Sequence, residues 1–194
     1  SFEFANSGYK DFRAMEVIKE GIEHAYVWVG SPGVNSGSEL EPAVHLLTTV
    51  LGRGMDSRLF VELREKRGLV YSVGAGCSSW QHGALSLIDF STREDNISES
   101  LELVDKEVSR VKMDLVSDEE LLRCKNKIRS GFYSAMEDSY SIAYWGLKEK
   151  MFGDDSIEKL MTKIESVTPR DIREAANRIY DNERSLYMVC KKEG

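Results

Sequence analysis

A helix-to-strand junction at residues 51–73 constrains the fold of this chain most strongly. A glycine-containing turn is followed by a short charged helix, a glycine and an apolar strand, with no spare residues between them. Asp56 is a good helix N-cap, and Gly68 suits the left-handed conformation that ends a helix. The apolar helix residues recur at helical spacing, and those from Leu69 onward are typical of a strand. The junction therefore predicts a helix end held against the start of a strand.

Two hydrogen-bond donors flank this junction. Arg64 lies in the last predicted helical turn and Tyr71 lies early on the predicted strand, so a guanidinium and a phenol seven positions apart can meet on one surface. Such a pair is suited to binding a peptide. A plainer interpretation also fits, because basic residues are common at solvated helix ends and tyrosine is an ordinary strand residue. The spacing alone leaves both interpretations open.

The segment SRLFVELREKRGLVYSV, residues 57–73, closely resembles a segment in the C-terminal domains of the pitrilysin/insulinase-type zinc metallopeptidases, which include the mitochondrial processing peptidases. The likeness covers nearly the whole chain in family order. It includes a strand around residues 24–33, an apolar strand after Gly83, a helix start at Ser117-Asp-Glu-Glu-Leu and the segment Val167-Thr-Pro-Arg-Asp-Ile.

This resemblance implies that chemistry is divided between two domains. In active members of the family, zinc and the general base lie on a His-x-x-Glu-His helix of an N-terminal domain, whereas the C-terminal domain supplies an arginine and a tyrosine that reach the bound peptide. In this sequence those residues are Arg64 and Tyr71, which would hold a substrate carbonyl or the oxyanion formed on attack. Two departures affect the preceding turn: Arg53 interrupts the glycine run, and Asp56 stands where serine is usual.

A zinc site is not expected in this chain. Hydrolytic zinc needs three protein ligands, and two histidines on adjacent helical turns are the usual core of such a site. The histidines are His24, His45 and His82, and no two of them are four residues apart. We interpret His45, on the helix that the resemblance matches to the zinc helix, as an ordinary helix residue. We therefore expect no cofactor in this chain and zinc in a partner half.

Composition excludes several classes of protein. With 194 residues, 41% of them hydrophobic and 30% charged, the chain is long enough for one sizeable core. The net charge of -7 argues against nucleic-acid binding, which needs a concentrated basic surface. The three cysteines suit a reducing compartment, where we expect them as small buried apolar residues. No apolar run reaches membrane-span length and no signal-peptide pattern opens the chain, so we predict a cytoplasmic location and no membrane partner.

The order of predicted elements indicates an α+β fold, in which a mostly antiparallel sheet carries helices on one side. Strands are expected early, in the middle and at the end of the chain. The expected strands are 12–19, 23–30, 71–80, 84–91 and 185–190, with turns at 31–33 and 81–83. The expected helices begin near residues 40, 56, 97, 117 and 168, and Ser117 with Glu120 forms a predicted capping box.

Apolar spacing predicts which faces of two long helices are buried. The helix that begins near residue 97 carries a continuous apolar stripe, which should lie on the sheet. Its members are Ile97, Leu101, Val104, Val108 and Val111. In the helix that follows Ser117, the residues able to face inward are Leu121, Leu122, Ile128 and Phe132.

Some conspicuous residues are assigned no chemistry. Tyr140, Tyr144 and Trp145 recur at helical spacing, and we interpret them as core or domain-interface residues. The acidic pairs at 119–120 and 154–155 are interpreted as charges that complement helix N-termini.

Two functions remain open. In the favoured one, residues 1–194 form a single C-terminal-type domain, excised from a longer chain or acting as a separate partner subunit. It would close a cleavage chamber, bind extended peptide and present Arg64 and Tyr71, while a homologous zinc-bearing half hydrolyses the peptide; the chain alone is expected to be inactive. The alternative is an inactive structural homologue that serves as a scaffold or assembly subunit. The presence of both donors favours the first function.

Overall fold

The computed structural model describes residues 14–18, 20–80, 82–152, 157–180 and 186–191. Within these residues the chain forms a five-stranded sheet in the order β1-β5-β2-β4-β3. The strands are β1 Ala14–Ile18, β2 Ala25–Pro32, β3 Val70–Trp80, β4 Gly83–Thr92 and β5 Leu186–Lys191. The β1 and β5 strands run parallel, and the other neighbouring pairs are antiparallel. The predicted mostly antiparallel sheet is therefore confirmed, and β5 lies inside the sheet between β1 and β2.

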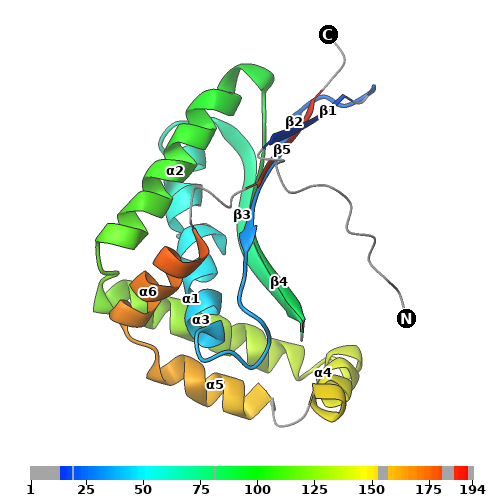
Figure 1. The fold of residues 1–194 in the computed structure, drawn as a ribbon, viewed down its shortest axis with the longest axis vertical. Coiled ribbons are helices and arrows are strands. Elements are labelled where there is room, and N and C mark those ends of the chain that lie inside the picture. The colour runs from blue at the N-terminus through cyan, green and yellow to red at the C-terminus, as the bar shows by residue number, and fades with distance from the viewer. Residues whose placement is uncertain (1–13, 19, 81, 153–156, 181–185, 192–194) are drawn as a thin grey trace.

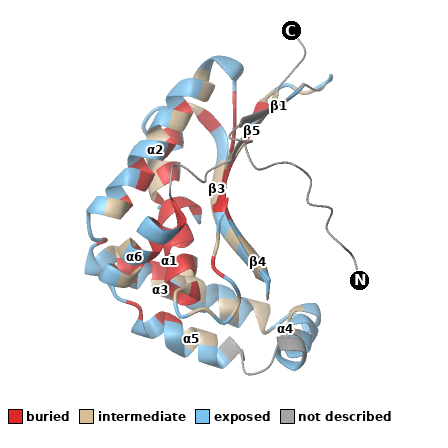
Figure 2. Ribbon diagram, viewed as in Figure 1, coloured by how far each residue is buried: buried red, intermediate tan, exposed pale blue. Residues whose placement is uncertain are grey.

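The helices cover one face of this sheet, as the sequence predicts (Figure 1). They are α1 Glu41–Gly52, the π-helical turn η1 Phe60–Glu65, the short 3-10 turn η2 Glu94–Asn96, α2 Ile97–Met113, α3 Asp118–Ala135, α4 Ser139–Phe152, α5 Ile157–Ser166 and α6 Pro169–Ile179. Buried residues gather where the helices face the sheet, and α4 is largely exposed (Figure 2). None of the described helices combines the length and apolar content that a membrane crossing requires.

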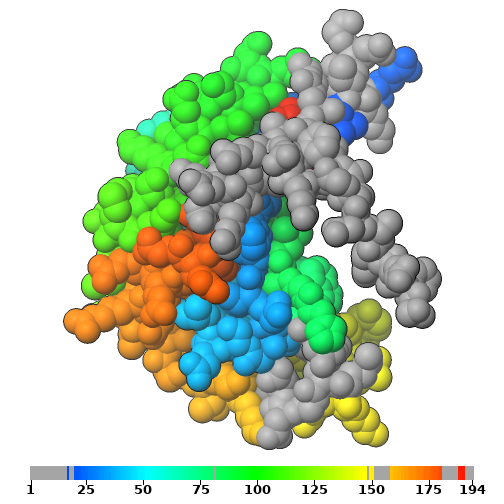
Figure 3. Space-filling view, viewed as in Figure 1, coloured from blue at the N-terminus to red at the C-terminus, as the bar shows by residue number. Residues whose placement is uncertain are grey.

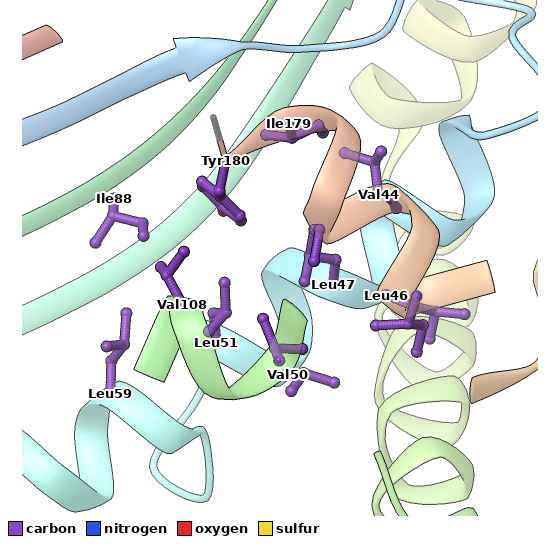
Figure 4. Close-up of a cluster of buried hydrophobic side chains, with 14 of the residues drawn as sticks. Val44, Leu46, Leu47, Val50, Leu51, Leu59, Ile88, Val108, Ile179 and Tyr180 are labelled. Carbon is purple, nitrogen blue, oxygen red and sulfur yellow. The ribbon is translucent and has the colours of Figure 1, made fainter. Parts of the chain in front are cut away.

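The hydrophobic core forms around α1, which packs against β3 and against α3, α5 and α6. Figure 4 shows Leu59 and Val108 directed into the same space as Ile88 of β4, below the end of α6. Leu51, Leu59 and Ile88 are fully buried. Each fully buried side chain of this size contributes about 1.5–3 kcal/mol by leaving water. Burial of the predicted apolar stripe of α2 is confirmed at Val104, Val108 and Val111, whereas Ile97 and Leu101 are half-buried. The helix packs chiefly against α6, and its predicted place on the sheet is not confirmed by these contacts.

The end of α1 lies unusually close to β3. A Cβ atom added at Gly52 would lie 2.3 Å from the backbone nitrogen of Ala75 and 2.6 Å from its Cβ. Only glycine therefore permits this approach between helix and strand. The contact holds β3, which is the last strand in the sheet order, against the helical layer.

Two helix starts are capped by side chains. Thr168 caps α6, and Asp171 completes the capping box by accepting from the Thr168 backbone N–H. Ser117 caps α3 by accepting from the Glu120 backbone N–H at 3.1 Å, as predicted. The Glu120 carboxylate does not return to Ser117, because it binds Arg58 instead. Half of the predicted box at Ser117 is therefore wrong.

The turn predicted at residues 31–33 is also wrong, because β2 continues to Pro32. Ser31 pairs with Ser86 and Pro32 with Leu85 in the antiparallel ladder. Among the described residues, β5 pairs with β2 as far as Gly30, so the proline at the end of β2 removes none of the described hydrogen bonds on that side. Serine and proline favour a turn by composition, but the ladder with β4 extends the strand through them.

Two predictions of burial fail for a shared reason. Leu122 is exposed rather than directed inward from α3, because Leu121 and Cys124 take the buried face of that helix. Among the cysteines only Cys124 is buried, whereas Cys77 and Cys190 lie on strands and are half-buried. Both predictions use residue type as the guide, but the position on a helix or strand decides burial.

The aromatic residues of α4 do not belong to the core. Tyr140 is 76% exposed, and Tyr144 is exposed as well, while Trp145 is half-buried. The helix stands at the lower right of the molecule in Figure 1, and its atoms reach the surface there in Figure 3. Of the two interpretations offered for these residues, burial in the core is therefore excluded for the two tyrosines. The acidic residues 154–155 lie outside the described residues.

The second face of the sheet carries no described helix (Figure 1). Because side chains alternate along a strand, Val27 and Ile88 point into the core while Trp28 and Asp89, which pair across β2 and β4, point to this face. The Asp89 carboxylate lies beside Gly74 of β3. Partial burial raises the pKa of Asp89 above its usual value. The open face therefore holds a carboxyl group that is costly to ionise.

Replacing Gly52 with alanine should lower the free energy of unfolding by about 3 kcal/mol or more, since its Cβ would overlap backbone that cannot move freely. Chemical denaturation of both proteins measures this difference. The matched control is Gly76→Ala on the facing strand, where an added Cβ meets nothing within 4 Å. Equal effects of the two substitutions would contradict a special contact at Gly52.

Asp89→Asn should raise the unfolding temperature at neutral pH. Because the folded state raises the pKa of Asp89, the protonated carboxyl favours folding, and this contribution is lost as the pH rises through the raised value. The advantage of the uncharged asparagine should therefore be present near pH 7 and disappear near pH 3. Thermal unfolding at both pH values measures it, with Asp95→Asn on the exposed turn η2 as the control. A lower unfolding temperature for Asp89→Asn at pH 7 would refute burial of the charge as the cause of the raised pKa.

Candidate functional site

The helix that carries Arg64 is not the regular α-helix predicted from its spacing. The chain enters it at Arg58, where Ser57 accepts the first backbone hydrogen bond from Val61, and Phe60–Glu65 adopts a π-helical turn. The prediction of Asp56 as the N-cap is wrong, because its carboxylate pairs with Lys127 of α3. π-Helical turns are rare and occur often at functional positions.

The turn before this helix accommodates Arg53 without distortion. Arg53 has a φ of -103°, an ordinary extended value, whereas Gly54 has a φ of +98°. The left-handed conformation is therefore required at Gly54 alone, and a residue with a side chain fits in the middle of the glycine run. The Lys127 ammonium donates to the Arg53 carbonyl oxygen at 2.8 Å, which fixes the turn to α3.

An ion pair anchors the same segment from the other side. The Arg58 guanidinium donates to both carboxylate oxygens of Glu120, at 2.8 Å from Nε and 2.7 Å from Nη2. This hydrogen bonding raises the pKa of Arg58 above its usual value, against the opposing effect of burial. A bidentate pair of this kind restricts both position and orientation. Glu120, which the sequence indicates as a capping-box residue and a helix-start charge, thus supports this segment through Arg58.

Among the described residues, Arg64 is the basic side chain of segment 58–67 for which no ion pair is found. Glu62 accepts from Lys66 at 2.5 Å and from Arg67 at 2.6 Å. These two hydrogen bonds lower the pKa of Glu62, the contact with Lys66 most. The exposed Arg64 guanidinium instead lies 5.1 Å from the centre of the Phe60 ring, within the range of a cation–π contact. Its hydrogen-bond donors can therefore serve a ligand.

Gly68 ends the helix as predicted. Its φ is +61°, and its backbone N–H donates to the Arg64 carbonyl at 3.1 Å. The bond from Gly68 to Arg64 is that of the αL type of helix end, and the Leu69 N–H donates one residue further back, to the Leu63 carbonyl at 2.9 Å. Leu63 is fully buried beneath this turn, so the position of the helix end relative to the sheet is set by the core.

Tyr71 lies at a β-bulge. The register of β3 against β4 shifts between Val70, which pairs with Thr92, and Ser72, which pairs with Ser91. Tyr71 between them has no opposing residue, and bulges commonly redirect a side chain. Its side chain is exposed and stacks on the His24 ring, with ring centres 3.9 Å apart.

Arg64 and Tyr71 therefore lie on either side of Gly68, on elements that contact each other, and each rests on an aromatic neighbour. Within the described residues, the ring contacts of the two side chains are with Phe60 and His24 and not with each other. Their meeting on one bound peptide remains a prediction. The sequence gives no sign of the stacking role of His24, because nothing in the spacing indicates that a residue before β2 reaches the start of β3.

The residues near His45 do not form a zinc site. Its Nε2 atom lies 3.9 Å from the Glu41 carboxylate, and its Nδ1 atom lies 3.4 Å from the Cys77 sulfur. Because these neighbours are on opposite ring nitrogens, they cannot bind one ion together with the imidazole. Across the described ranges, no three His, Cys, Asp or Glu side chains gather as a possible metal site.

A cavity of about 220 Å³ between α1, α3, α4 and α5 lies apart from the two donors. It is mostly apolar and is lined by residues that include His45, Arg53 and Trp145, but by neither Arg64 nor Tyr71. The candidate site is therefore the exposed surface at the helix-to-strand junction, not this cavity.

Comparison with known proteins identifies the family. The profile described as peptidase M16 inactive domain matches residues 6–128. The chain is 31% identical over 177 residues to an uncharacterized zinc protease of Streptomyces coelicolor. The aligned residues make up 90% of this chain and 39% of that relative. An uncharacterized zinc protease of Bacillus subtilis is 24% identical over 173 residues, covering 88% and 42%. The chain spans about two fifths of the length of these relatives.

Solved structures share the fold. A protease from Helicobacter pylori superposes with a TM-score of 0.84 at 19% identity, covering 92% of this chain and 44% of that chain. At these identities the likeness concerns the fold alone. Because the family profile matches more than half of the chain, this protein belongs to the peptidase M16 family and corresponds to the domain that the family describes as inactive.

Proposed function

We propose that this chain is the zinc-free half of a metallopeptidase, in which Arg64 and Tyr71 bind the peptide while a homologous half holds the zinc. The observation that carries the proposal is that both side chains are exposed donors while the nearby cations are neutralised. Lys66 and Arg67 are paired with Glu62, so Arg64 remains for an incoming carbonyl or carboxylate. The family membership and the zinc proteases among the relatives support it.

The two donors suit the chemistry of amide hydrolysis. Attack on a peptide carbonyl moves negative charge onto its oxygen, and donors that are already in place stabilise that charge. Arg64 can offer a charged pair of N–H groups, and Tyr71 a single phenolic O–H. Their task in this proposal is to hold the peptide and the developing oxyanion. Activation of water belongs to the other half.

The exposed side chains of α4 fit the same proposal as part of the contact with the homologous half. Tyr140, Ile142, Tyr144 and Leu147 are all more than half exposed, on a helix that packs little against the rest of the described chain. Such clusters on a protein surface usually mark an interface. The relatives are more than twice the length of this chain, which leaves enough polypeptide for a second half. In this proposal α4 helps to close the chamber.

The structural alternative is an inactive scaffold subunit. Complex III2 from Candida albicans contains a chain that superposes with a TM-score of 0.81 at 13% identity, over 93% of this chain and 46% of that chain. This likeness concerns the fold and does not separate the two functions. The mass of the natural polypeptide, and the presence or absence of a His-x-x-Glu-His segment within it or its partner, would separate them. The cytoplasmic location stays a prediction.

Arg64→Ala and Tyr71→Phe should each lower peptide turnover by about ten- to a thousandfold in the complete protease, the range seen on loss of one oxyanion donor. The assay measures kcat and KM on the full-length protein, or on this chain with its zinc-bearing partner. Arg67→Ala and Tyr26→Phe are matched controls, because Arg67 is paired with Glu62 and Tyr26 lies on the open sheet face. Turnover unchanged in both test variants would refute the proposal.

A further inference from the structure

The contact between His24 and Tyr71 joins two strands that are not neighbours. His24 directly precedes β2, whereas Tyr71 is on β3, and β4 lies between these strands in the sheet. The two rings nevertheless stack with centres 3.9 Å apart and planes inclined by 26°. The contact therefore passes over the end of β4, where Thr92 pairs with both Ala25 and Val70.

The backbone of Tyr71 is fixed on both sides of the bulge. The Thr92 hydroxyl donates to the Leu69 carbonyl at 2.5 Å, and the Ser72 and Ser91 hydroxyls lie 2.7 Å apart. Val70 is buried. With its neighbours anchored in this way, the main remaining freedom of Tyr71 is rotation of its side chain. An exposed tyrosine normally occupies several staggered rotamers, and a stacked partner favours one of them.

His24 contributes to the structure chiefly through the face of its ring. Its Nδ1 atom is buried and makes no hydrogen bond within the described part of the chain. Leaving a buried polar atom without a partner is unfavourable, so hydrogen bonding at Nδ1 does not explain the position of this side chain. The stacked Tyr71 ring is the described contact that does.

We propose that His24 is the positioning residue for Tyr71. Its ring holds the phenol in one orientation at the bulge, so that the hydroxyl projects from the junction that also carries Arg64. Only the expected effect of His24 on turnover rests on the proposed function. The orientation itself is a property of the folded chain and can be measured without substrate.

The first test is structural and uses His24→Phe and His24→Leu. Phenylalanine keeps a ring for stacking, whereas leucine keeps comparable apolar bulk without a ring. In NMR spectra with ring-labelled tyrosine, assigned with Tyr71→Phe, we expect the Tyr71 ring signals to move in His24→Leu as the ring-current shift is lost. They should stay shifted in His24→Phe. His82→Ala, in the exposed hairpin, is the control and should leave them unchanged.

The second test is kinetic and uses the complete protease. His24→Leu should lower kcat by about three- to tenfold, less than loss of the hydroxyl in Tyr71→Phe, and His24→Phe should restore it. Combined with Tyr71→Phe, His24→Leu should have little additional effect. Tyr71 ring signals that do not move in His24→Leu would overturn the positioning role. Equal kcat values of His24→Leu and His24→Phe would also overturn it, provided that Tyr71→Phe lowers turnover. If Tyr71→Phe itself leaves turnover unchanged, the role of Tyr71 in the proposed function fails, and the NMR result still decides whether His24 orients Tyr71.

Discussion

The close approach of α1 to β3 is the contact on which the rest of the site depends. Gly52 lets the end of α1 lie directly on the backbone at Ala75, and Leu59 and Leu63 then fill the space beneath the next helix. Since protein interiors are densely packed, these positions leave the chain little choice of path between the two elements. The helix end at Gly68 and the start of β3 are fixed as a result. Exposed side chains can still be well placed when the residues under them are fully buried.

Both candidate residues lie where regular structure is interrupted. Arg64 is on a π-helical turn and Tyr71 is at a β-bulge, each of which changes the direction of a side chain relative to regular geometry. Each irregularity is supported by ordinary interactions nearby. The Arg58–Glu120 pair fixes the start of the helix, and hydrogen bonds with Thr92 and Ser91 hold the strand on either side of the bulge.

The parts of the fold that could be predicted are those set by local periodicity. The buried residues of the α2 stripe, the end of the helix at Gly68 and the strands around the hairpin follow from spacing and turn chemistry, and they are confirmed. The parts that could not be predicted depend on distant partners. Asp56 and Glu120 both have the pattern of helix-cap residues, but Lys127 and Arg58, more than sixty positions away, take their carboxylates. The π-helical turn and the His24 stack likewise result from tertiary packing, which no local pattern contains. The Arg64 and Tyr71 positions follow from a family resemblance, and their joint action remains a prediction.

The exposure of the two donors explains why the proposed chemistry would need a second half. A charge or hydrogen bond at an exposed side chain competes with water, and its effect on a developing oxyanion is small while the dielectric constant around it is high. Arg64 is exposed and the Tyr71 side chain is 48% exposed in this chain. Covering the junction with a homologous domain would remove water from both donors without moving them, and the same covering would bring the zinc and the peptide to them. In the proposed function, the isolated half would hold the two donors in place, but their stabilisation of the oxyanion would be weak until the chamber closes. Separation of the two halves should therefore lower activity even where each half keeps its fold.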